Sequence, residues 1–174
     1  MKSFRLKKLI SRKEIMQKAD KVASIIDKQY ADKNPLIIYA LVGGKPFFEI
    51  LTSKLHIPFD TDFVWVRSYA GTKSGELKWL ERNKKDFTGR NCLLVDDILD
   101  TGKTMKLLKE YIEKNGAVSC KVCVAVDKLE RREEDIEPDF VLFRVEKGFL
   151  VGFGMDYDEM FRELKDICII EEDV

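Results

Sequence analysis

The stretch LLVDDILDTGKTM, residues 93–105, decides the fold of this chain. Apolar residues run into Asp96 and Asp97, two more apolar residues follow, and residues 100–104 then open an amphipathic helix. Backbone N–H groups, a glycine and two hydroxyls at a helix N-terminus form a ready site for a phosphate dianion. The stretch therefore predicts a buried strand that leads into a phosphate-binding helix.

Three carboxylates crowd this stretch, at Asp96, Asp97 and Asp100. Helix capping explains one aspartate, but three within five residues repel one another unless a cation or a hydroxyl-bearing ligand offsets the charge. The first two can accept hydrogen bonds from vicinal hydroxyls or help to hold a hydrated cation. The sequence Gly102-Lys103 resembles the end of a P-loop, but an aspartate replaces the earlier glycine, which argues against an ordinary NTPase. A ribose phosphate suits both halves of the stretch.

Strands and helices alternate on both sides of this stretch. Ser11 and Glu14 have the spacing of a capping box, which predicts a first helix with apolar residues at helical spacing. The other predicted elements are strands at 36–44, 61–69, 120–128, 139–145 and 149–157, a strand from Asn91 into the carboxylates, helices from Pro46, at 104–116 and around 159–164, and a loop or loose hairpin at 70–79.

This alternation predicts an α/β fold with a mostly parallel twisted sheet flanked by helices. Ligands of such sheets bind beyond the carboxyl ends of the strands. A chain of 174 residues is the size of one domain, so we expect residues 1–174 to form a single domain.

Composition excludes several classes of protein. The 31 basic and 31 acidic side chains give a formal net charge of zero, so we expect no nucleic-acid partner. No apolar run approaches the roughly 18 residues of a membrane span, and no apolar segment of a secretory signal follows the basic N-terminus. We therefore expect no membrane association and a cytoplasmic location. The charged runs at 84–85 and 130–134 are typical of solvated surfaces.

Cys120 and Cys123 form a CxxC pattern, which occurs in zinc and redox sites. The surrounding SCKVCVAV reads as a buried strand, and a strand directs residues three apart to opposite faces. We therefore expect buried free thiols rather than a metal site.

VDDILDTGKT, residues 95–104, resembles the phosphoribosyl pyrophosphate motif of the type I phosphoribosyltransferases, and specifically of the hypoxanthine-guanine phosphoribosyltransferases. The resemblance continues in order through LVGG at 41–44, VDKLERRE at 126–133 and PDFVLFRVEKGFLVGFGMDYDEMFREL at 138–164. It implies the type I phosphoribosyltransferase fold, with a small hood formed by the N- and C-terminal segments.

The resemblance also implies roles for the residues around the sugar. Asp100 would be the general acid/base at purine N7, and Asp96 and Asp97 would bind the ribose hydroxyls. A non-proline cis peptide would lie between Leu41 and Val42. The 5-phosphate would bind Thr101, Gly102, Lys103 and Thr104; pyrophosphate would bind Leu41, Val42, Gly43 and Arg162; and Ser68 and Tyr69 would begin a lid loop.

In the purine-binding half, the resemblance assigns Lys128 to the 6-oxo group, Phe149 to stacking on the base and the backbone of Leu150 to the base edge. Asp156 would lie near the exocyclic group, and Mg²⁺ would bind Asp96, Asp97 and Asp156. Relatives often carry Glu-Asp at 96–97, lysine at 42 and a charged residue at 148, where this chain has Asp-Asp, Val42 and Gly148.

The implied reaction is purine salvage, in which a 5-phosphoribosyl group passes from phosphoribosyl pyrophosphate to hypoxanthine or guanine and yields IMP or GMP plus pyrophosphate. The expected partners are these two substrates and a second copy of the chain, in a homodimer or homotetramer. Two alternatives stay open: an enzyme that prefers xanthine, and a non-catalytic regulator that senses nucleotides on the same fold.

Overall fold

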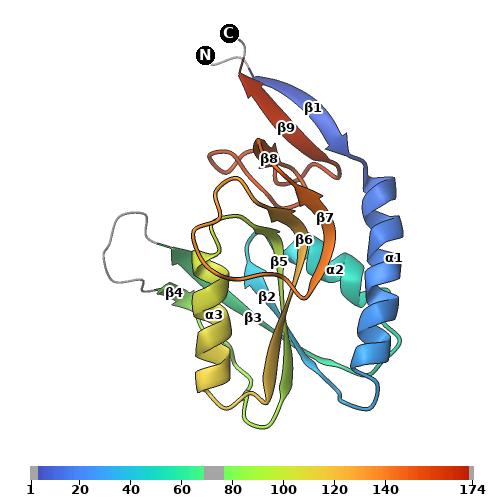
Figure 1. The fold of residues 1–174 in the computed structure, drawn as a ribbon, viewed down its shortest axis with the longest axis vertical. Coiled ribbons are helices and arrows are strands. Elements are labelled where there is room, and N and C mark those ends of the chain that lie inside the picture. Colours follow the sequence, from blue (N-terminus) through green and yellow to red (C-terminus); the bar gives the residue numbers. More distant parts are fainter. Residues whose placement is uncertain (1–3, 69–76, 173–174) are drawn as a thin grey trace.

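The computed structural model describes residues 4–68 and 77–172, and its ribbon is shown in Figure 1. Within these residues no helix is long and apolar enough to cross a membrane. The elements are β1 (Phe4–Ile10), α1 (Arg12–Gln29), β2 (Leu36–Leu41), α2 (Lys45–Thr52), β3 (Asp60–Ser68), β4 (Leu77–Glu81), β5 (Asn91–Leu99), α3 (Lys103–Lys114), β6 (Ser119–Lys128), β7 (Phe140–Val145), β8 (Phe149–Val151) and β9 (Ile167–Glu172).

The central sheet has the strand order β4-β3-β2-β5-β6-β7. Strands β3, β2, β5, β6 and β7 are parallel, and β4 pairs antiparallel with β3. The chain adds β3 on one side of β2 and then continues with β5 on the other side, which makes a topological switch point between β2 and β5. The predicted α/β fold with a mostly parallel sheet is confirmed. Of the loop or hairpin expected at residues 70–79, the structure describes residues 77–79, which belong to the antiparallel strand β4.

Helix α1 begins where the capping box predicts it. The Ser11 hydroxyl accepts a hydrogen bond from the Glu14 N–H at 3.3 Å, and the Glu14 carboxylate accepts one from the Ser11 N–H at 2.8 Å. This reciprocal pair satisfies two donors that the first turn cannot use. The buried face of the helix carries the predicted apolar residues Ile15, Ala19, Val22, Ala23 and Ile26.

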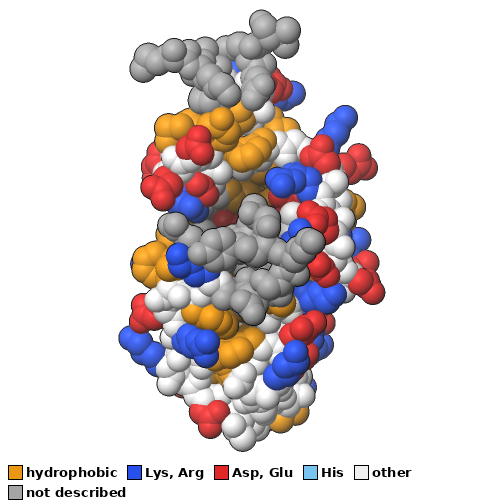
Figure 2. Space-filling view, turned by 90° about the vertical axis from the view of Figure 1, so that its left-hand side faces the viewer, with side chains coloured by type: hydrophobic (Ala, Val, Ile, Leu, Met, Phe, Trp, Pro, Cys, Tyr) orange, Lys and Arg blue, Asp and Glu red, His pale blue; other side chains and the backbone are white. Residues whose placement is uncertain are grey.

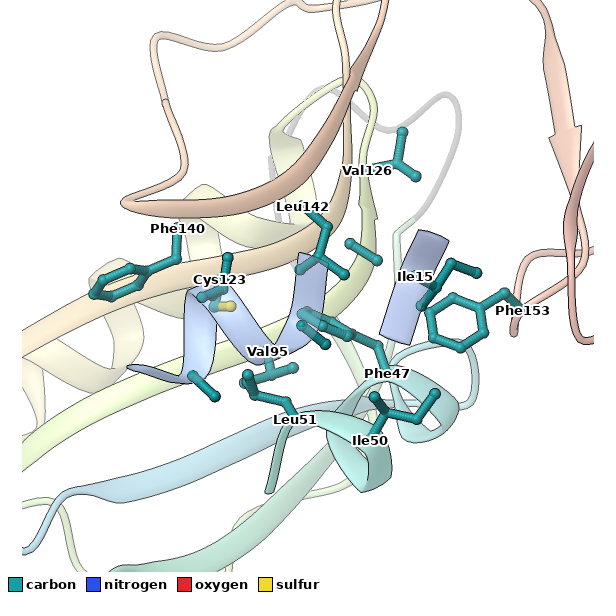
Figure 3. Close-up of a cluster of buried hydrophobic side chains, with 14 of the residues drawn as sticks. Ile15, Phe47, Ile50, Leu51, Val95, Cys123, Val126, Phe140, Leu142 and Phe153 are labelled. Atoms are coloured by element: carbon teal, nitrogen blue, oxygen red, sulfur yellow. The ribbon is translucent and has the colours of Figure 1, made fainter. Parts of the chain in front are cut away.

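Two hydrophobic cores lie on opposite faces of the sheet. One joins the sheet to α1 and α2, and Figure 3 shows its labelled side chains converging. The other joins the sheet to α3. Cys123 belongs to the first core and Cys120 to the second, so the CxxC residues point to opposite faces as expected. All four cysteines are free and buried, and burial raises the pKa of the Cys92 thiol to about 11.

A small three-stranded antiparallel sheet of order β1-β9-β8 stands above the carboxyl ends of the main sheet (Figure 1). It joins the two ends of the chain and forms the expected hood. Neither β1 nor a strand at residues 167–170 is predicted from the sequence. Leu6 and Leu9 in β1 are 36% and 43% exposed, so no clear buried face marks the strand, and only its pairing with β9 defines it.

Two predicted elements near the C-terminus are wrong. The strand expected at 149–157 ends at Val151 because Gly152, Phe153 and Gly154 have φ angles of 88°, 54° and 99°. The helix expected around 159–164 is replaced by turns, in which Glu159 and Phe161 have φ angles of 66° and 74°. Left-handed backbone ends both regular patterns.

The turn at residues 152–154 also carries Phe153 into the core of the main sheet. Its ring centroid lies 6.4 Å from that of Phe47 on α2, and both side chains are buried (Figure 3). Apolar packing therefore attaches the hood to the main sheet and its helix α2.

We expect Phe47→Ala to lower the free energy of unfolding by about 3–5 kcal/mol, because it leaves a cavity between the body and the hood. Urea denaturation followed by circular dichroism measures this change. Ile25→Ala, on the same layer but 53% exposed, is the control and should change the free energy by about 0.5 kcal/mol or less. Equal effects of the two substitutions would contradict the role assigned to Phe47.

Candidate active site

A cavity of about 510 Å³ opens at the carboxyl ends of β2, β5 and β6, below the hood. This is the switch point of the sheet, where the fold itself predicts a ligand site. Its lining includes most of the residues singled out from the sequence, namely Leu41, Val42, Gly43, Asp96, Asp97, Asp100, Thr104, Lys128, Phe149, Leu150, Asp156 and Arg162.

The loop after β2 lies directly beside the carboxylates of β5. The Leu41-Val42 peptide is cis, as the resemblance implies. A Cβ added to Gly43 would overlap the Asp97 carboxylate, so only glycine allows this approach. Gly154 from the hood packs against the backbone of Gly43 in turn, because a Cβ there would overlap the Gly43 carbonyl oxygen. Three distant segments therefore meet at the edge of the cavity.

Asp96 and Asp97 lie within β5, which continues to Leu99 instead of stopping at the carboxylates as predicted. The Asp97 N–H donates to Asp96 Oδ1 at 2.8 Å, and the Ile98 N–H donates to Asp97 Oδ1 at 2.8 Å. Burial and the neighbouring Asp97 charge raise the pKa of Asp96 well above its ordinary value, and burial also raises the pKa of Asp97. Ligand hydroxyls or a cation would relieve this cost.

The loop between β5 and α3 has the form of an anion site. Gly102 has a φ of 87° and caps α3 with no side chain of its own, and the one side-chain acceptor at this turn among the described residues is the Thr101 hydroxyl, 3.4 Å from the Lys103 N–H. A second cavity of about 160 Å³ lies against this loop, and Thr101, Gly102 and Thr104 line it. Lys103 points elsewhere, since its ammonium pairs with Glu133. The uncapped N-terminus of a twelve-residue helix fits a phosphate.

The lining of the main cavity also includes a buried cation and an exposed aromatic ring. Lys128 at the end of β6 is only 4% exposed, and its ammonium lies 3.4 Å from Asp100 Oδ1 and 3.6 Å from Glu130 Oε2. Phe149 is 46% exposed although it begins β8. Its ring packs edge-to-face with Tyr157, at 5.3 Å between centroids, and its exposed surface can stack on a flat ligand.

Asp156 and Arg162 form one unit at the rim of the cavity. Arg162 pairs with Asp156 Oδ1 at 2.7 Å and donates to the Gly154 carbonyl at 2.7 Å. Asp156 Oδ2 also accepts the Glu159 N–H at 2.8 Å. The turns that replace the predicted helix thus hold a guanidinium and a carboxylate in place.

Sequence reading missed Arg132 and Asp127. The prediction of a solvated charged run is wrong at Arg132, because its guanidinium bonds the Asp127 carboxylate at 2.5 Å and the carbonyls of Leu99, at the end of β5, and Asp100. The only signal was an aspartate at the end of a strand that is apolar on both faces, a position that requires a cationic partner.

The lid stays a prediction. Ser68 ends β3, and Tyr69 lies outside the described residues. Within residues 4–68 and 77–172, no three His, Cys, Asp or Glu side chains gather as a metal site that the protein completes alone.

Residues 7–158 match the model of the phosphoribosyl transferase domain, and the chain belongs to this family. It is 40% identical to a hypoxanthine-guanine phosphoribosyltransferase of Lactococcus lactis, over 97% of this chain and 92% of the relative.

Solved structures agree with this similarity. A hypoxanthine-guanine phosphoribosyltransferase from Bacillus anthracis has a TM-score of 0.90 at 28% identity and matches 97% of this chain and 99% of its own. Hypoxanthine phosphoribosyltransferase from Trypanosoma cruzi, in complex with the product IMP, has a TM-score of 0.89 at 32% identity over 94% of this chain and 93% of its own.

The raised pKa of Asp96 leads to a stability prediction for the protein free of ligands and divalent cations. A carboxyl whose pKa is higher in the folded than in the unfolded chain lowers stability once the pH rises above about 4. We expect Asp96→Asn to raise the melting temperature near neutral pH by about 2–4 °C, the shift that 1 kcal/mol produces at this chain length. The gain should shrink as the pH falls toward about 4.

Differential scanning fluorimetry across pH, in the presence of EDTA, measures this effect. Asp135→Asn, at an exposed residue, is the control and should leave the melting temperature unchanged. A gain for Asp96→Asn that does not vary with pH would contradict the electrostatic explanation.

Proposed function

We propose that this chain is a hypoxanthine-guanine phosphoribosyltransferase, which transfers the 5-phosphoribosyl group of phosphoribosyl pyrophosphate to a 6-oxopurine and releases pyrophosphate. One observation carries the proposal. Two cavities that share Asp96, Asp97, Asp100 and Thr104 join the N-terminus of α3 to the Asp96–Asp97 carboxylate pair, and the larger one also contains the buried Lys128 and the exposed Phe149. These groups match the phosphate, the sugar hydroxyls and the base of one nucleotide.

The base half of the cavity suits a 6-oxopurine. The Lys128 ammonium is a donor, and a ring carbonyl is the acceptor it would meet. Phe149 offers an open face for stacking, and Leu150 beside it offers backbone groups for the base edge. Asp156 lies at the rim, where an exocyclic amino group would donate. This combination supports hypoxanthine and guanine, the first giving IMP and the second GMP.

The sugar half follows from the carboxylates and the two loops. Asp96 and Asp97 are acceptors for the ribose hydroxyls, which would offset their desolvation. The 5-phosphate would bind residues 101–104 at the start of α3. The backbone of residues 41–43 and the Arg162 guanidinium would bind the diphosphate, since both supply donors at the same edge of the cavity.

Asp100 is placed to manage the proton of the incoming base. Its carboxylate lines the cavity and lies between Lys128 and Arg131, at 3.4 Å and 3.5 Å. As the ring nitrogen bonds to C1 of the ribose, the bond from C1 to pyrophosphate breaks, and Asp100 takes up the proton at N7. Lys128 holds the carboxylate until the base arrives. Positioning and charge stabilisation supply most of the rate.

Mg²⁺ fits the donors of this cavity. Asp96, Asp97 and Asp156 supply carboxylate oxygens on its lining and would hold the ion, since Mg²⁺ commonly binds one or two carboxylates together with substrate phosphates and water. A cation would also lower the raised pKa of the carboxyl pair on β5. When bound, Mg²⁺ neutralises the diphosphate and improves it as a leaving group.

The alternative of a nucleotide-sensing regulator needs a basic surface for nucleic acid. Figure 2 shows basic and acidic side chains interspersed on the face that carries α3 and β4, which favours the enzyme. Xanthine is the second candidate base, because Gly148 places no charge beside the stacking ring. A cytoplasmic location is part of the proposal, and four free buried thiols fit a reducing compartment. A homodimer or homotetramer is also part of the proposal, and sedimentation would measure the oligomeric state.

The proposal is tested with phosphoribosyl pyrophosphate, Mg²⁺ and each of hypoxanthine, guanine, xanthine, adenine and uracil. We expect turnover of hypoxanthine and guanine and its loss when EDTA removes the metal. Asp100→Asn should lower kcat by about 100-fold or more, because it removes the proton acceptor. Asp20→Asn, at an exposed residue of α1, is the control and should keep the rate of the unaltered chain.

The relative rates of the bases decide the substrate preference of the enzyme, since faster turnover of xanthine would favour the xanthine-preferring alternative. Nucleotide binding without turnover of any base would overturn the enzyme and favour the regulator.

A further inference from the structure

Residues 99–102, between β5 and α3, are called the phosphate loop below. Arg132 lies behind this loop and not in the cavity. Its side chain is 17% exposed, and neither cavity at the site has it in its lining. Its guanidinium donates to the Asp100 carbonyl through Nε at 3.0 Å, and to the Leu99 carbonyl through Nη2 at 3.0 Å. It donates to the Ile136 carbonyl through Nη1 at 2.8 Å. One side chain therefore binds the end of β5 and the segment that follows β6.

A third carbonyl of the phosphate loop faces the same way. The Thr101 carbonyl accepts the N–H groups of Glu133 and Glu134 at 3.0 Å and 3.1 Å. Three successive carbonyls, at residues 99, 100 and 101, thus point toward segment 131–136. In a trans peptide the N–H points opposite to the carbonyl oxygen. The N–H groups of residues 100, 101 and 102 therefore point away from this segment, toward the side where the 160 Å³ cavity lies.

Successive N–H groups that converge on one side of a loop form an anion-binding concavity. This arrangement requires glycine at residue 102, since a Cβ there would crowd Ile136 Cγ2 and approach the side chains of Glu134 and Arg132. No protein acceptor among the described residues takes the N–H of Thr101 or Gly102. Segment 131–136 holds the loop from behind and leaves its donors free for a ligand.

Asp127 holds the guanidinium in place. Its carboxylate is 3% exposed, bonds Arg132 Nη2 at 2.5 Å and lies 3.5 Å from Arg144 Nε. Asp127 directly precedes Lys128, whose carbonyl also accepts from Arg132 at 3.3 Å. A buried pair of this kind requires both partners. The pair therefore links the phosphate loop to the strand that presents the buried lysine.

We propose that Arg132 is a positioning residue for the phosphoribosyl group: through the Leu99 and Asp100 carbonyls it orients two peptide planes, beside the third that the Glu133 and Glu134 N–H groups hold, so that their N–H groups face the 5-phosphate. The inference rests on the proposed function for the identity of the ligand. Arg132 acts through the backbone and does not touch the substrate. The planar fork of arginine reaches several acceptors at once, which the single ammonium of lysine does not reproduce.

Arg132→Lys tests the proposal, because it keeps the charge beside Asp127 and loses the fork. The dissociation constant of phosphoribosyl pyrophosphate with Mg²⁺ is measured by calorimetry, and the KM values of phosphoribosyl pyrophosphate and hypoxanthine are measured separately. We expect the dissociation constant and KM of phosphoribosyl pyrophosphate to rise at least tenfold and the KM of hypoxanthine to change less than threefold. Arg132→Gln should show a larger rise in the same direction.

Arg144→Gln is the matched control. It removes the other cationic partner of Asp127, is 61% exposed, and has no contact with the phosphate loop, so binding of phosphoribosyl pyrophosphate should stay within twofold. A folded Arg132→Lys variant with unchanged binding would overturn the proposal. So would loss of folding in both Arg132 variants while Arg144→Gln folds, because Arg132 would then serve stability alone. Absence of turnover in the unaltered chain would count against the proposed function, while the binding comparison would still decide the role of Arg132.

Discussion

The parallel pairing of β5 with β2 on one side and β6 on the other is the constraint on which the rest of the structure depends. It buries Leu93, Leu94 and Val95 completely and brings the carboxyl ends of three strands to one edge. Because the connections leave that edge in opposite directions, the loops after β2 and β5 part and leave a crevice. Every group of the candidate site extends from that edge or belongs to the hood segment that packs over it.

Electrostatics then determines what the crevice accepts. The adjacent Asp96 and Asp97 carboxyls on β5 repel each other, and the second is buried, while the buried Lys128 ammonium neighbours Asp100. Hydroxyl donors or a cation would offset the charge of the carboxyl pair, and a carbonyl acceptor suits the Lys128 ammonium, which is a donor. A ribosyl phosphate beside an oxopurine supplies all of these partners in one ligand set.

The strands of the hood are not predicted by local sequence patterns. Strand β1 has no clear buried face, and β9 follows turns with left-handed residues, so neither has a pattern that stands out by itself. Each is defined by the other, across the whole length of the chain. The turns between β8 and β9 likewise depend on long-range contacts, because Phe153 leaves the hood to pack against Phe47.

The sequence by itself determined the alternation of strands and helices, the capping of α1, the opposite faces of Cys120 and Cys123, and the family motif at residues 95–104. These follow from short-range periodicity and from residue types whose chemistry is fixed at any position in a fold. Only the tertiary structure decided the hood and the role of the Arg132–Asp127 pair. A charged residue in a polar run is the same in sequence whether it is solvated or buried, and only the packing of segment 131–136 behind the phosphate loop gives Arg132 its partners.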